Sequence, residues 1–158
     1  MREIILTKGY KAIVDDIDFE WLSKFNWFAN LDVGGYVSAR ANHKGTLLKM
    51  HRMIMAAYDS NVIVDHIDRN SLNNQRNNLR ICTKRENHCN IGLTVRNTSG
   101  YKGVNFYKIT NRWVAKISIN GLRKSIGYFD TKEEAALAYN EMAKLHHGEF
   151  AYLNKINT

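Results

Sequence analysis

Residues 62–90, VIVDHIDRNSLNNQRNNLRICTKRENHCN, decide how the fold of this chain is interpreted. A β-branched run ends at Asp65 and His66, an asparagine-rich loop follows, and a second apolar run at 79–82 leads into a polar segment with Asn87. This order predicts strand, loop, strand and helix. A hairpin capped by one helix can bring Asp65, His66 and Asn87 together, so the stretch predicts a compact site for one hard cation.

Side-chain chemistry explains why these residue types belong together. A magnesium-class ion prefers oxygen ligands and keeps waters and substrate phosphates, so the Asp65 carboxylate and the Asn87 amide suffice as protein ligands. Hydrolysis of a phosphodiester also needs a proton acceptor near neutral pH, and the imidazole of His66 can fill that role. Neighbours on a strand point to opposite faces. Asp65 and His66 can therefore share a site only where the strand ends or bends, which residues 67–70 allow.

The pattern resembles the HNH endonucleases of the ββα-metal type, particularly the phage and intron-encoded homing endonucleases. The residues that carry the resemblance are Asp65-His66, Asn78 in Asn77-Asn78-Leu79-Arg80, and Asn87 in Arg85-Glu86-Asn87. It implies that His66 is the general base, that Asn78 braces the loop, and that Asp65 and Asn87 bind Mg²⁺ or Mn²⁺. Asn87 stands where the family often has histidine, and His88 is the alternative ligand.

Each of these features alone has an ordinary structural explanation. An Asp-His pair is common in turns, and asparagine clusters are usually turn chemistry. The order and spacing of the whole set are specific. The alternative functions are a catalytically inactive DNA-binding or regulatory protein that retains the scaffold, and a nuclease for RNA or branched DNA.

The length of 158 residues fits one ordinary domain or two small ones. We predict an α+β chain with a nuclease module at 1–91, a linker at 92–99 and a DNA-binding domain at 100–158. The net charge of +8 and the pI near 9.5 suit a polyanionic partner.

Cysteine content and hydropathy indicate where the protein acts. Cys82 and Cys89 form no CxxC pair and are too few for a four-thiolate zinc clamp, so we expect reduced thiols, one of them buried. No apolar run approaches membrane-spanning length, and the opening segment 1–6 is too short for a secretory signal. We expect a cytoplasmic protein of a bacterial host cell, encoded by a phage or an intron.

Residues 1–60 show hairpin signals and two short helical patterns. Strands are predicted at 4–6, 12–14 and 36–41, the last after Gly34-Gly35. Asp18 is predicted to cap a brief helix whose inner face is Trp21, Leu22 and Phe25. A second helix is predicted at 48–58, with Met50, Met53, Ile54 and Ala57 inward. On that helix His51 and Arg52 fit an exposed face, and phosphate contact by Arg52 is the alternative.

Cations lie close to the predicted metal site in the sequence. They are Arg69, Arg76, Arg80, Lys84 and Arg85. Arginine binds phosphate through two N–H groups at once, so we favour Arg76 and Arg80 as clamps on the DNA backbone. Solvated surface charges would give the same pattern.

The segment from Asn87 through Phe129 contains no acidic residue. Cations are spread along it: Arg96, Lys102, Lys108, Arg112, Lys116, Arg123 and Lys124. Within it, residues 92–99 lack apolar periodicity, which indicates a linker that lies along DNA or remains an unbound tether.

The carboxy-terminal region alternates apolar and polar residues. The alternation predicts strands at 104–107, 115–120 and 123–126, with Asn120-Gly121 as a two-residue hairpin turn. Thr131 and Glu134 predict a capping box at the start of a helix that ends at Gly148. The predicted buried stripe of this helix is Ala135, Ala138, Tyr139, Met142 and Leu145. Three strands on one helix leave the other sheet face open, and that face is polar and basic.

Residues 99–154 resemble the Apetala-two/ethylene-response-factor DNA-binding domain. The resemblance rests on Gly100-Tyr101-Lys102-Gly103-Val104, Arg112-Trp113, Gly127-Tyr128-Phe129, Glu133-Glu134-Ala135-Ala136, Ala138-Tyr139 and Gly148-Glu149-Phe150. It implies that the DNA-facing positions are Asn105, Tyr107, Lys116, Ser118, Arg123 and Ser125, joined by Arg96 and Lys102 as basic contacts. Several are arginine or tryptophan in the family. We expect Trp113 and Tyr128 in the core, and His146-His147 at the helix end.

Taken together, these patterns predict a metal-dependent DNA endonuclease of homing type. It would nick duplex DNA one phosphodiester at a time and leave a 5′-phosphate and a 3′-hydroxyl. One chain carries one site, so we expect a monomer or a weak homodimer.

Overall fold

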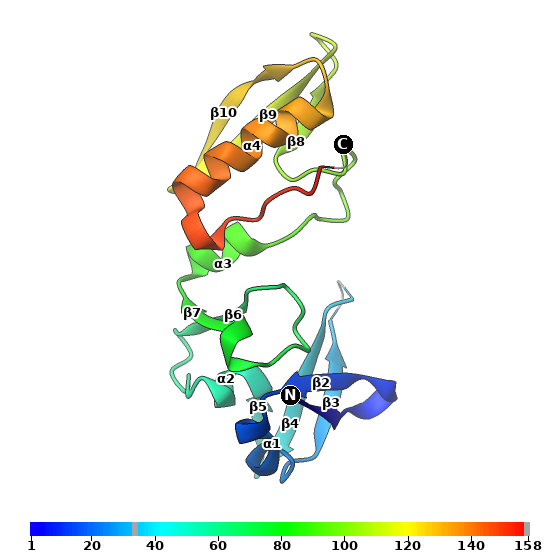
Figure 1. Ribbon diagram of the computed structural model, residues 1–158, viewed down its shortest axis with the longest axis vertical. Coiled ribbons are helices and arrows are strands. Elements are labelled where there is room, and N and C mark those ends of the chain that lie inside the picture. Colours follow the sequence, from blue (N-terminus) through cyan, green and yellow to red (C-terminus); the bar gives the residue numbers. More distant parts are fainter. Residues whose placement is uncertain (33–34, 157–158) are drawn as a thin grey trace. The chain divides into compact units, whose positions relative to one another are not determined.

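The computed structural model describes residues 1–32 and 35–156, and the chain divides into two compact units (Figure 1). Unit 1 is Met1–Lys84 and unit 2 is Arg85–Thr158, so the division precedes residue 91, the predicted end of the nuclease module. Both units mix small sheets with helices. None of the described helices has both the length and the apolar composition needed to cross a bilayer.

The strands of unit 1 form small antiparallel sheets. β1 (Arg2–Ile5) pairs with β2 (Lys11–Val14), β3 (Trp27–Leu31), β4 (Val37–His43) and β5 (Thr46–Lys49) pair in that order, and β6 (Ile63–His66) pairs with β7 (Leu79–Cys82). The helical segments are η1 (Thr7–Gly9), α1 (Asp16–Leu22), α2 (Met50–Ile54) and η2 (Arg76–Asn78). Each predicted strand overlaps an observed one, with bounds shifted by a few residues, whereas β3 and β5 were not predicted. Gly34 of the predicted turn lies outside the described residues.

The core of unit 1 forms where α1, α2 and the sheets meet. Val14, Leu22 and Met50 are wholly buried there. The second predicted helix is shorter than 48–58, because Leu48 pairs with Ala41 in the sheet and Ala56 takes a left-handed φ of 50° that ends the helical run. Leu48 therefore belongs to a strand.

The predicted cap of α1 is wrong. The helix begins at Asp16 after Asp15, and Asp18 lies inside it with no exposed surface. The carboxylate of Asp18 accepts hydrogen bonds from Trp21 and Arg76. Asp18 was misassigned because its partner Arg76 is 58 positions away.

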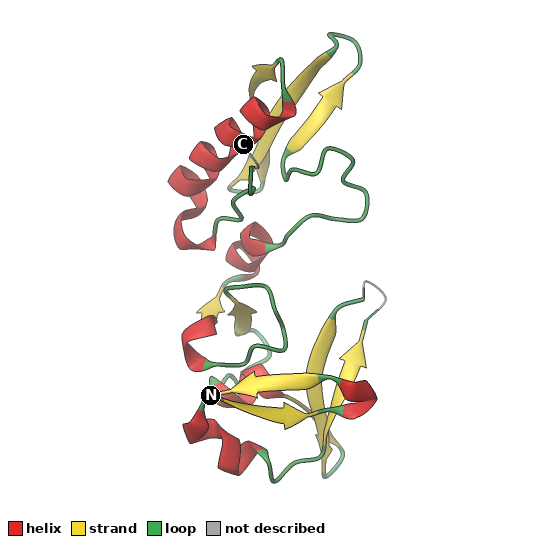
Figure 2. Ribbon diagram, turned by 45° about the vertical axis from the view of Figure 1, so that its right-hand side comes forward, coloured by secondary structure: helices red, strands yellow, loops and turns green. Residues whose placement is uncertain are grey.

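Unit 2 is a three-stranded antiparallel sheet packed on one long helix (Figure 2). The strands β8 (Val104–Tyr107), β9 (Arg112–Ile119) and β10 (Leu122–Phe129) lie in the order β10-β9-β8. Asn120 and Gly121 both have positive φ, 54° and 80°, as a two-residue hairpin turn requires. The predicted strands and turn are confirmed. The unit also contains α3 (Lys84–Asn90) from Arg85 onward.

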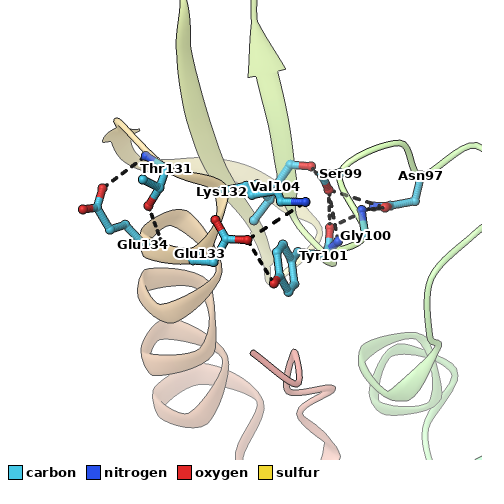
Figure 3. Close-up of polar contacts among 9 residues, drawn as sticks. All are labelled: Asn97, Ser99, Gly100, Tyr101, Val104, Thr131, Lys132, Glu133 and Glu134. Atoms are coloured by element: carbon cyan, nitrogen blue, oxygen red, sulfur yellow. Dashed lines mark hydrogen bonds and ion pairs between the residues drawn. The ribbon is translucent and has the colours of Figure 1, made fainter. Parts of the chain in front are cut away.

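The long helix α4 (Lys132–His147) begins and ends where the sequence predicts. The hydroxyl of Thr131 accepts a hydrogen bond from the backbone N–H of Glu134. The carboxylate of Glu134 accepts one from the backbone N–H of Thr131, and the two bonds form the capping box (Figure 3). Gly148 caps the other end before η3 (Gly148–Phe150), so His146-His147 do form the helix end. The buried face consists of Ala135, Ala136, Tyr139, Asn140 and Ala143.

The buried stripe predicted for α4 is wrong at its last position. Leu145 is 73% exposed, and the small residue Ala143 packs under Ile117 and Ile119 instead. Leu145 lies on the side of α4 that faces away from the sheet, so it stays exposed although the last helical turn reaches β9 through His147.

Gly103 lets the chain enter β8 close to α4. It has a φ of +77°, and an added Cβ would lie 2.2 Å from the ring of Tyr139 and 2.6 Å from the carbonyl oxygen of Lys116. The preceding segment 92–99 has no strand or helix, as predicted for a linker. Its last residues nevertheless bind β8, because Ser99 donates to the carbonyl of Val104 (Figure 3).

Candidate active site and nucleic-acid interface

Asp65 lies on β6 and is buried with Arg80 of β7 as its partner. The register places the two residues opposite each other. Both Nε and Nη2 of Arg80 donate to Oδ2 of Asp65, at 3.0 and 2.8 Å, and the two side chains are 10% and 8% exposed. A buried carboxylate needs such a partner to offset its lost hydration.

His66 is the last residue of β6, and its ring orientation is fixed by Asn74. Nε2 lies 3.3 Å from Oδ1 of Asn74, and Asn74 donates its own amide hydrogen to the carbonyl of Ser71. Oδ1 therefore faces the imidazole, which assigns the ring proton to Nε2 and the lone pair to Nδ1. Burial lowers the pKa of His66, while the hydrogen bond with Asn74 and the carboxylates of Asp68 and Asp65 oppose this shift. The lowered pKa keeps the ring neutral at physiological pH.

Asn78 braces the loop between β6 and β7. Its Oδ1 accepts from the backbone N–H of Asp68 at 3.0 Å, and its Nδ2 donates to Oδ1 of Asp68 and to the carbonyl of Asn73, at 2.9 and 2.8 Å. Asp68 also accepts from Asn70 and Asn73, and these hydrogen bonds lower its pKa against the opposing effect of burial. The asparagine-rich loop is thus held in one conformation by its own side chains.

The same loop is anchored to the amino-terminal hairpin. The N–H of Ile13 donates to Leu72, and the N–H of Asn74 donates to the carbonyl of Ile13, both at 2.7 Å. Asp15 accepts from the backbone of Arg76 and from the side chain of Gln75, and these bonds lower its pKa. Strand β2 therefore positions the loop that orients His66.

His51, which the sequence placed on an exposed face, is a neighbour of His66. Their ring centroids are 5.2 Å apart with an edge-to-face tilt. Burial, followed by the charge of His66, lowers the pKa of His51 to about 3. Arg52 donates to the carbonyls of Val62 and Asp59, at 2.5 and 2.6 Å, and so braces the turn before β6.

The two arginines predicted to clamp DNA both bind carboxylates of unit 1. Arg80 binds Asp65, as described above. Arg76 forms a two-point ion pair with Asp18, with Nε and Nη2 each 2.7 Å from a carboxylate oxygen. Their contact with DNA stays a prediction, and the fold already gives each guanidinium a partner.

Asn87 and His88 lie on α3 in different surroundings. Asn87 is half-buried, whereas His88 is exposed and lines a pocket of about 230 Å³ in unit 2 with Asn97, Lys102 and the segment 91–94. Cys82 is buried and Cys89 half-buried, and both are thiols, as predicted. Among residues 1–32 and 35–156, no three His, Cys, Asp or Glu residues form a group that could hold a metal.

The open face of the sheet in unit 2 carries all six predicted DNA-facing residues. Cross-strand partners share a face, and the register pairs Lys116 with Ser125 and Ser118 with Arg123. Asn105 lies opposite Val114 and Tyr107 opposite Arg112, on that same face by alternation. The helix α4 packs on the other face, against Val104, Ala115, Ile117 and Ile119.

The observed position of Tyr128 differs from the predicted one. It was expected in the core, but it is 47% exposed and its ring lies 5.9 Å from that of Tyr107 on the open face. The register explains this, because Tyr128 pairs with Val114 after the irregularity between Ser125 and Gly127. Trp113 is on the opposite face and packs against the core, as expected.

Arg96 and Lys102, the two other predicted DNA contacts, differ in their exposure to solvent. Arg96 is exposed in the segment before β8. Lys102 is half-buried, and its ammonium donates to the carbonyls of Cys89 and Ile91.

Comparisons with known proteins identify the family. A model of the HNH endonuclease family matches residues 49–89, and a model of the AP2 domain matches residues 99–149. An uncharacterized HNH endonuclease of Acanthamoeba polyphaga mimivirus is 36% identical over 156 residues, which cover 95% of this chain and 78% of that protein. The chain belongs to the HNH endonucleases.

This HNH endonuclease also resembles Protein 3.8 of Escherichia phage T7, with 35% identity over 88 residues, 56% of this chain and 72% of that protein. No solved structure matches it. The comparisons confirm an HNH nuclease with an AP2-type DNA-binding domain. The HNH match begins at residue 49 and so includes His51, which the apolar pattern alone did not single out. It ends at 89, so its residues 85–89 belong to unit 2.

Proposed function

We propose that this HNH endonuclease hydrolyses duplex DNA one phosphodiester at a time, with one divalent cation held by Asp65 and Asn87 and with His66 as the general base. The observation that carries the proposal is the orientation of His66. Asn74 fixes the Nε2 side of the ring, and burial keeps the ring neutral. A neutral imidazole with its lone pair on Nδ1 is prepared to take a proton from water.

The donor chemistry fits a hard cation. A carboxylate from Asp65 and an amide oxygen from Asn87 are the ligand types that Mg²⁺ or Mn²⁺ accepts alongside waters and phosphate oxygens. A bound ion of this kind supplies stabilisation of the charge that develops on the scissile phosphate and the leaving 3′-oxygen. The exposure of His88, which lines a pocket in unit 2, favours Asn87 as the ligand on α3.

The remaining roles follow from where the side chains lie. Asn78 holds the loop that carries Asn74, so it acts on His66 indirectly, as a positioning residue. As a proton passes from water to Nδ1 of His66, the water oxygen would bond to phosphorus and the P–O3′ bond would break. The 3′-oxygen would take a proton from solvent, so the products carry a 5′-phosphate and a 3′-hydroxyl. One such site per chain cuts one strand, so a double-strand break requires two nicks in sequence or a weak homodimer.

Binding to duplex DNA is assigned to the open face of unit 2. A β-sheet can enter the wide major groove of B-form DNA but not the narrow groove of A-form RNA. Competition between duplex DNA, single-stranded DNA, branched DNA and RNA tests this choice. We propose a homing-type enzyme of a bacterial host, and the similarity to a protein of an Escherichia phage supports an origin in a phage.

Nicking of supercoiled plasmid with added Mg²⁺ tests the catalytic assignment. We expect His66→Ala to lose at least about 100-fold in rate, the lower range for removal of a general base, with little change in DNA affinity. The control is His88→Ala, which removes an exposed imidazole from the neighbouring helix and should keep the activity. Full cleavage by His66→Ala, or loss of Mg²⁺ dependence in His88→Ala rather than in Asn87→Ala, would refute the assignment.

A further inference from the structure

Lys102 was predicted to contact DNA, yet its ammonium points into its own unit. Nζ donates to the carbonyl of Cys89 at 2.7 Å and to that of Ile91 at 2.6 Å. Cys89 is the penultimate residue of α3, and Ile91 directly follows the helix. The cation therefore binds the carboxy-terminal end of α3.

The helix α3 needs such support because it has only seven residues. Isolated helices of this length are not stable in water. The last carbonyls of a helix have no partner within it, and they form the negative end of the helix dipole. An ammonium at this end satisfies two carbonyls and neutralises the dipole.

The backbone of Lys102 is itself held in place. Its N–H donates to Oδ1 of Asn154 at 2.6 Å, and its carbonyl accepts from Nδ2 of the same residue at 3.1 Å. Asn154 is buried and exchanges two hydrogen bonds with Asn140 of α4, at 2.9 and 2.7 Å. Lys102 thus connects α3 to the main helix of the DNA-binding unit.

Other contacts of α3 also lie within unit 2. Arg85 donates to the side chain of Asn120 in the β9–β10 turn. Asn90 is buried, and the Cys89 thiol lies near Tyr139 of α4, whose pKa is raised to about 12 by burial and then by Cys89 and Tyr152. Residues 85–90 are therefore packed as part of the AP2-type unit, although 85–89 match the HNH family.

We propose that Lys102 is a positioning residue that fixes α3, and with it Asn87, to the DNA-binding unit, and that it is not a DNA contact. This inference rests on the proposed function, in which Asn87 is a metal ligand. Loosening α3 would weaken metal binding before it weakened DNA binding.

The test compares Lys102→Met and Lys102→Arg with Lys116→Met on the open face. Methionine keeps the aliphatic stem and removes the charge, and arginine can still donate to two carbonyls. Amide hydrogen exchange of the metal-free protein is measured at residues 87–90. We expect exchange about 10-fold faster in Lys102→Met, restored in Lys102→Arg and unchanged in Lys116→Met. Unchanged exchange in Lys102→Met would overturn the proposal.

DNA affinity measured over a series of salt concentrations without divalent metal separates positioning from phosphate contact. Loss of one phosphate contact lowers the slope of log K against log[salt] by about 0.9. We expect this decrease for Lys116→Met and no decrease for Lys102→Met. A smaller slope for Lys102→Met would identify Lys102 as a DNA contact and overturn the proposal.

The Mg²⁺ concentration needed for half-maximal nicking completes the test. We expect this Mg²⁺ concentration to rise several-fold in Lys102→Met, with an unchanged KM for DNA. In Lys102→Arg it should return to the value of the parent protein. Asn87→Ala is measured in parallel. If Asn87→Ala raises the requirement and Lys102→Met does not, the positioning role fails while the proposed function stands. If Asn87→Ala has no effect, the ligand assignment in the proposed function fails, and Lys102 is not a positioning residue for the metal.

Discussion

Arg76 and Arg80 in unit 1 each donate to a buried carboxylate, whereas Arg123 on the open face of unit 2 is exposed and forms no ion pair among the described residues. All three are arginines of a basic nuclease that binds DNA. The difference teaches that a cation near the catalytic motif can be part of the fold, whereas a cation on the open face of the sheet, such as Arg123, stays exposed. Exchanging each arginine for methionine tests this contrast.

The largest effect is expected for Arg80→Met. It would leave the Asp65 carboxylate buried without its main partner, which typically costs about 3–5 kcal/mol. Chemical denaturation in a Trp113→Phe background, where Trp21 and Trp27 report unit 1, measures the free energy of unfolding. Adding Asp65→Asn should recover part of the loss, because no charge then remains buried. Stability equal to the parent in Arg80→Met would show that the pair contributes nothing, and the contrast between the units would disappear.

We expect the stability of unit 1 to depend on pH, with an effect of intermediate size. In the unfolded chain His51 takes up a proton below its ordinary pKa of 6.5, but in the folded chain burial lowers that pKa to about 3. The contribution of the neutral His51 ring to the free energy of unfolding is therefore fully present above pH 6.5. It is lost as the pH falls from 6.5 towards 3. The slope is at most about 1.4 kcal/mol per pH unit for one proton.

The urea midpoint of unit 1 between pH 7 and pH 4.5 measures this slope. His51→Gln keeps a polar side chain and cannot take the proton, so its midpoint should change less with pH. The lowered pKa of His66 acts in the same window and leaves a residual slope in the variant, whereas the lowered pKa values of Asp15 and Asp68 act at pH values below their ordinary 3.8. Equal slopes in the two proteins would mean that His51 is protonated in the folded state.

The smallest effect on the fold is expected for Arg123→Met, which should change the free energy of unfolding by less than about 0.5 kcal/mol, as surface substitutions do. Its effect is on DNA, where the salt slope should fall by about 0.9 for one lost phosphate contact. Arg76→Met is the matched variant and should show the reverse, a loss of stability with an unchanged salt slope. An unchanged slope in Arg123→Met would remove this residue from the interface.

Local patterns predicted local structure well. The Asn120-Gly121 turn and the capping box of Thr131 and Glu134 depend on residues a few positions apart, and the strands that carry Asp65 and Arg80 follow from two short apolar runs. The family resemblance supplied the six predicted DNA-facing residues, and the strand register places them on one face. The expectation of a buried Tyr128 was wrong, because the register after the irregularity in β10 puts its ring on the open face.

Contacts between distant residues could not be predicted. Asp18 looked like a helix cap because Arg76 is 58 positions away, and His51 looked exposed because its neighbour His66 lies on another element. Nothing in the sequence shows that the end of α3 is within reach of the Lys102 ammonium. For the candidate site, the residue types could be found from the sequence, but the side chains that orient them could not.

The parallel bridge between Ile13 and Asn73 has a practical consequence for anyone who dissects this enzyme. A fragment that begins where the HNH match begins, at residue 49, would contain every proposed catalytic side chain. It would nevertheless lack β2, in which Ile13 accepts a hydrogen bond from the N–H of Asn74 and donates one to the carbonyl of Leu72. It would also lack the Asp15 carboxylate, which accepts hydrogen bonds from Gln75 and Arg76. We therefore expect the smallest working nuclease to be larger than its recognisable motif and to include the first hairpin.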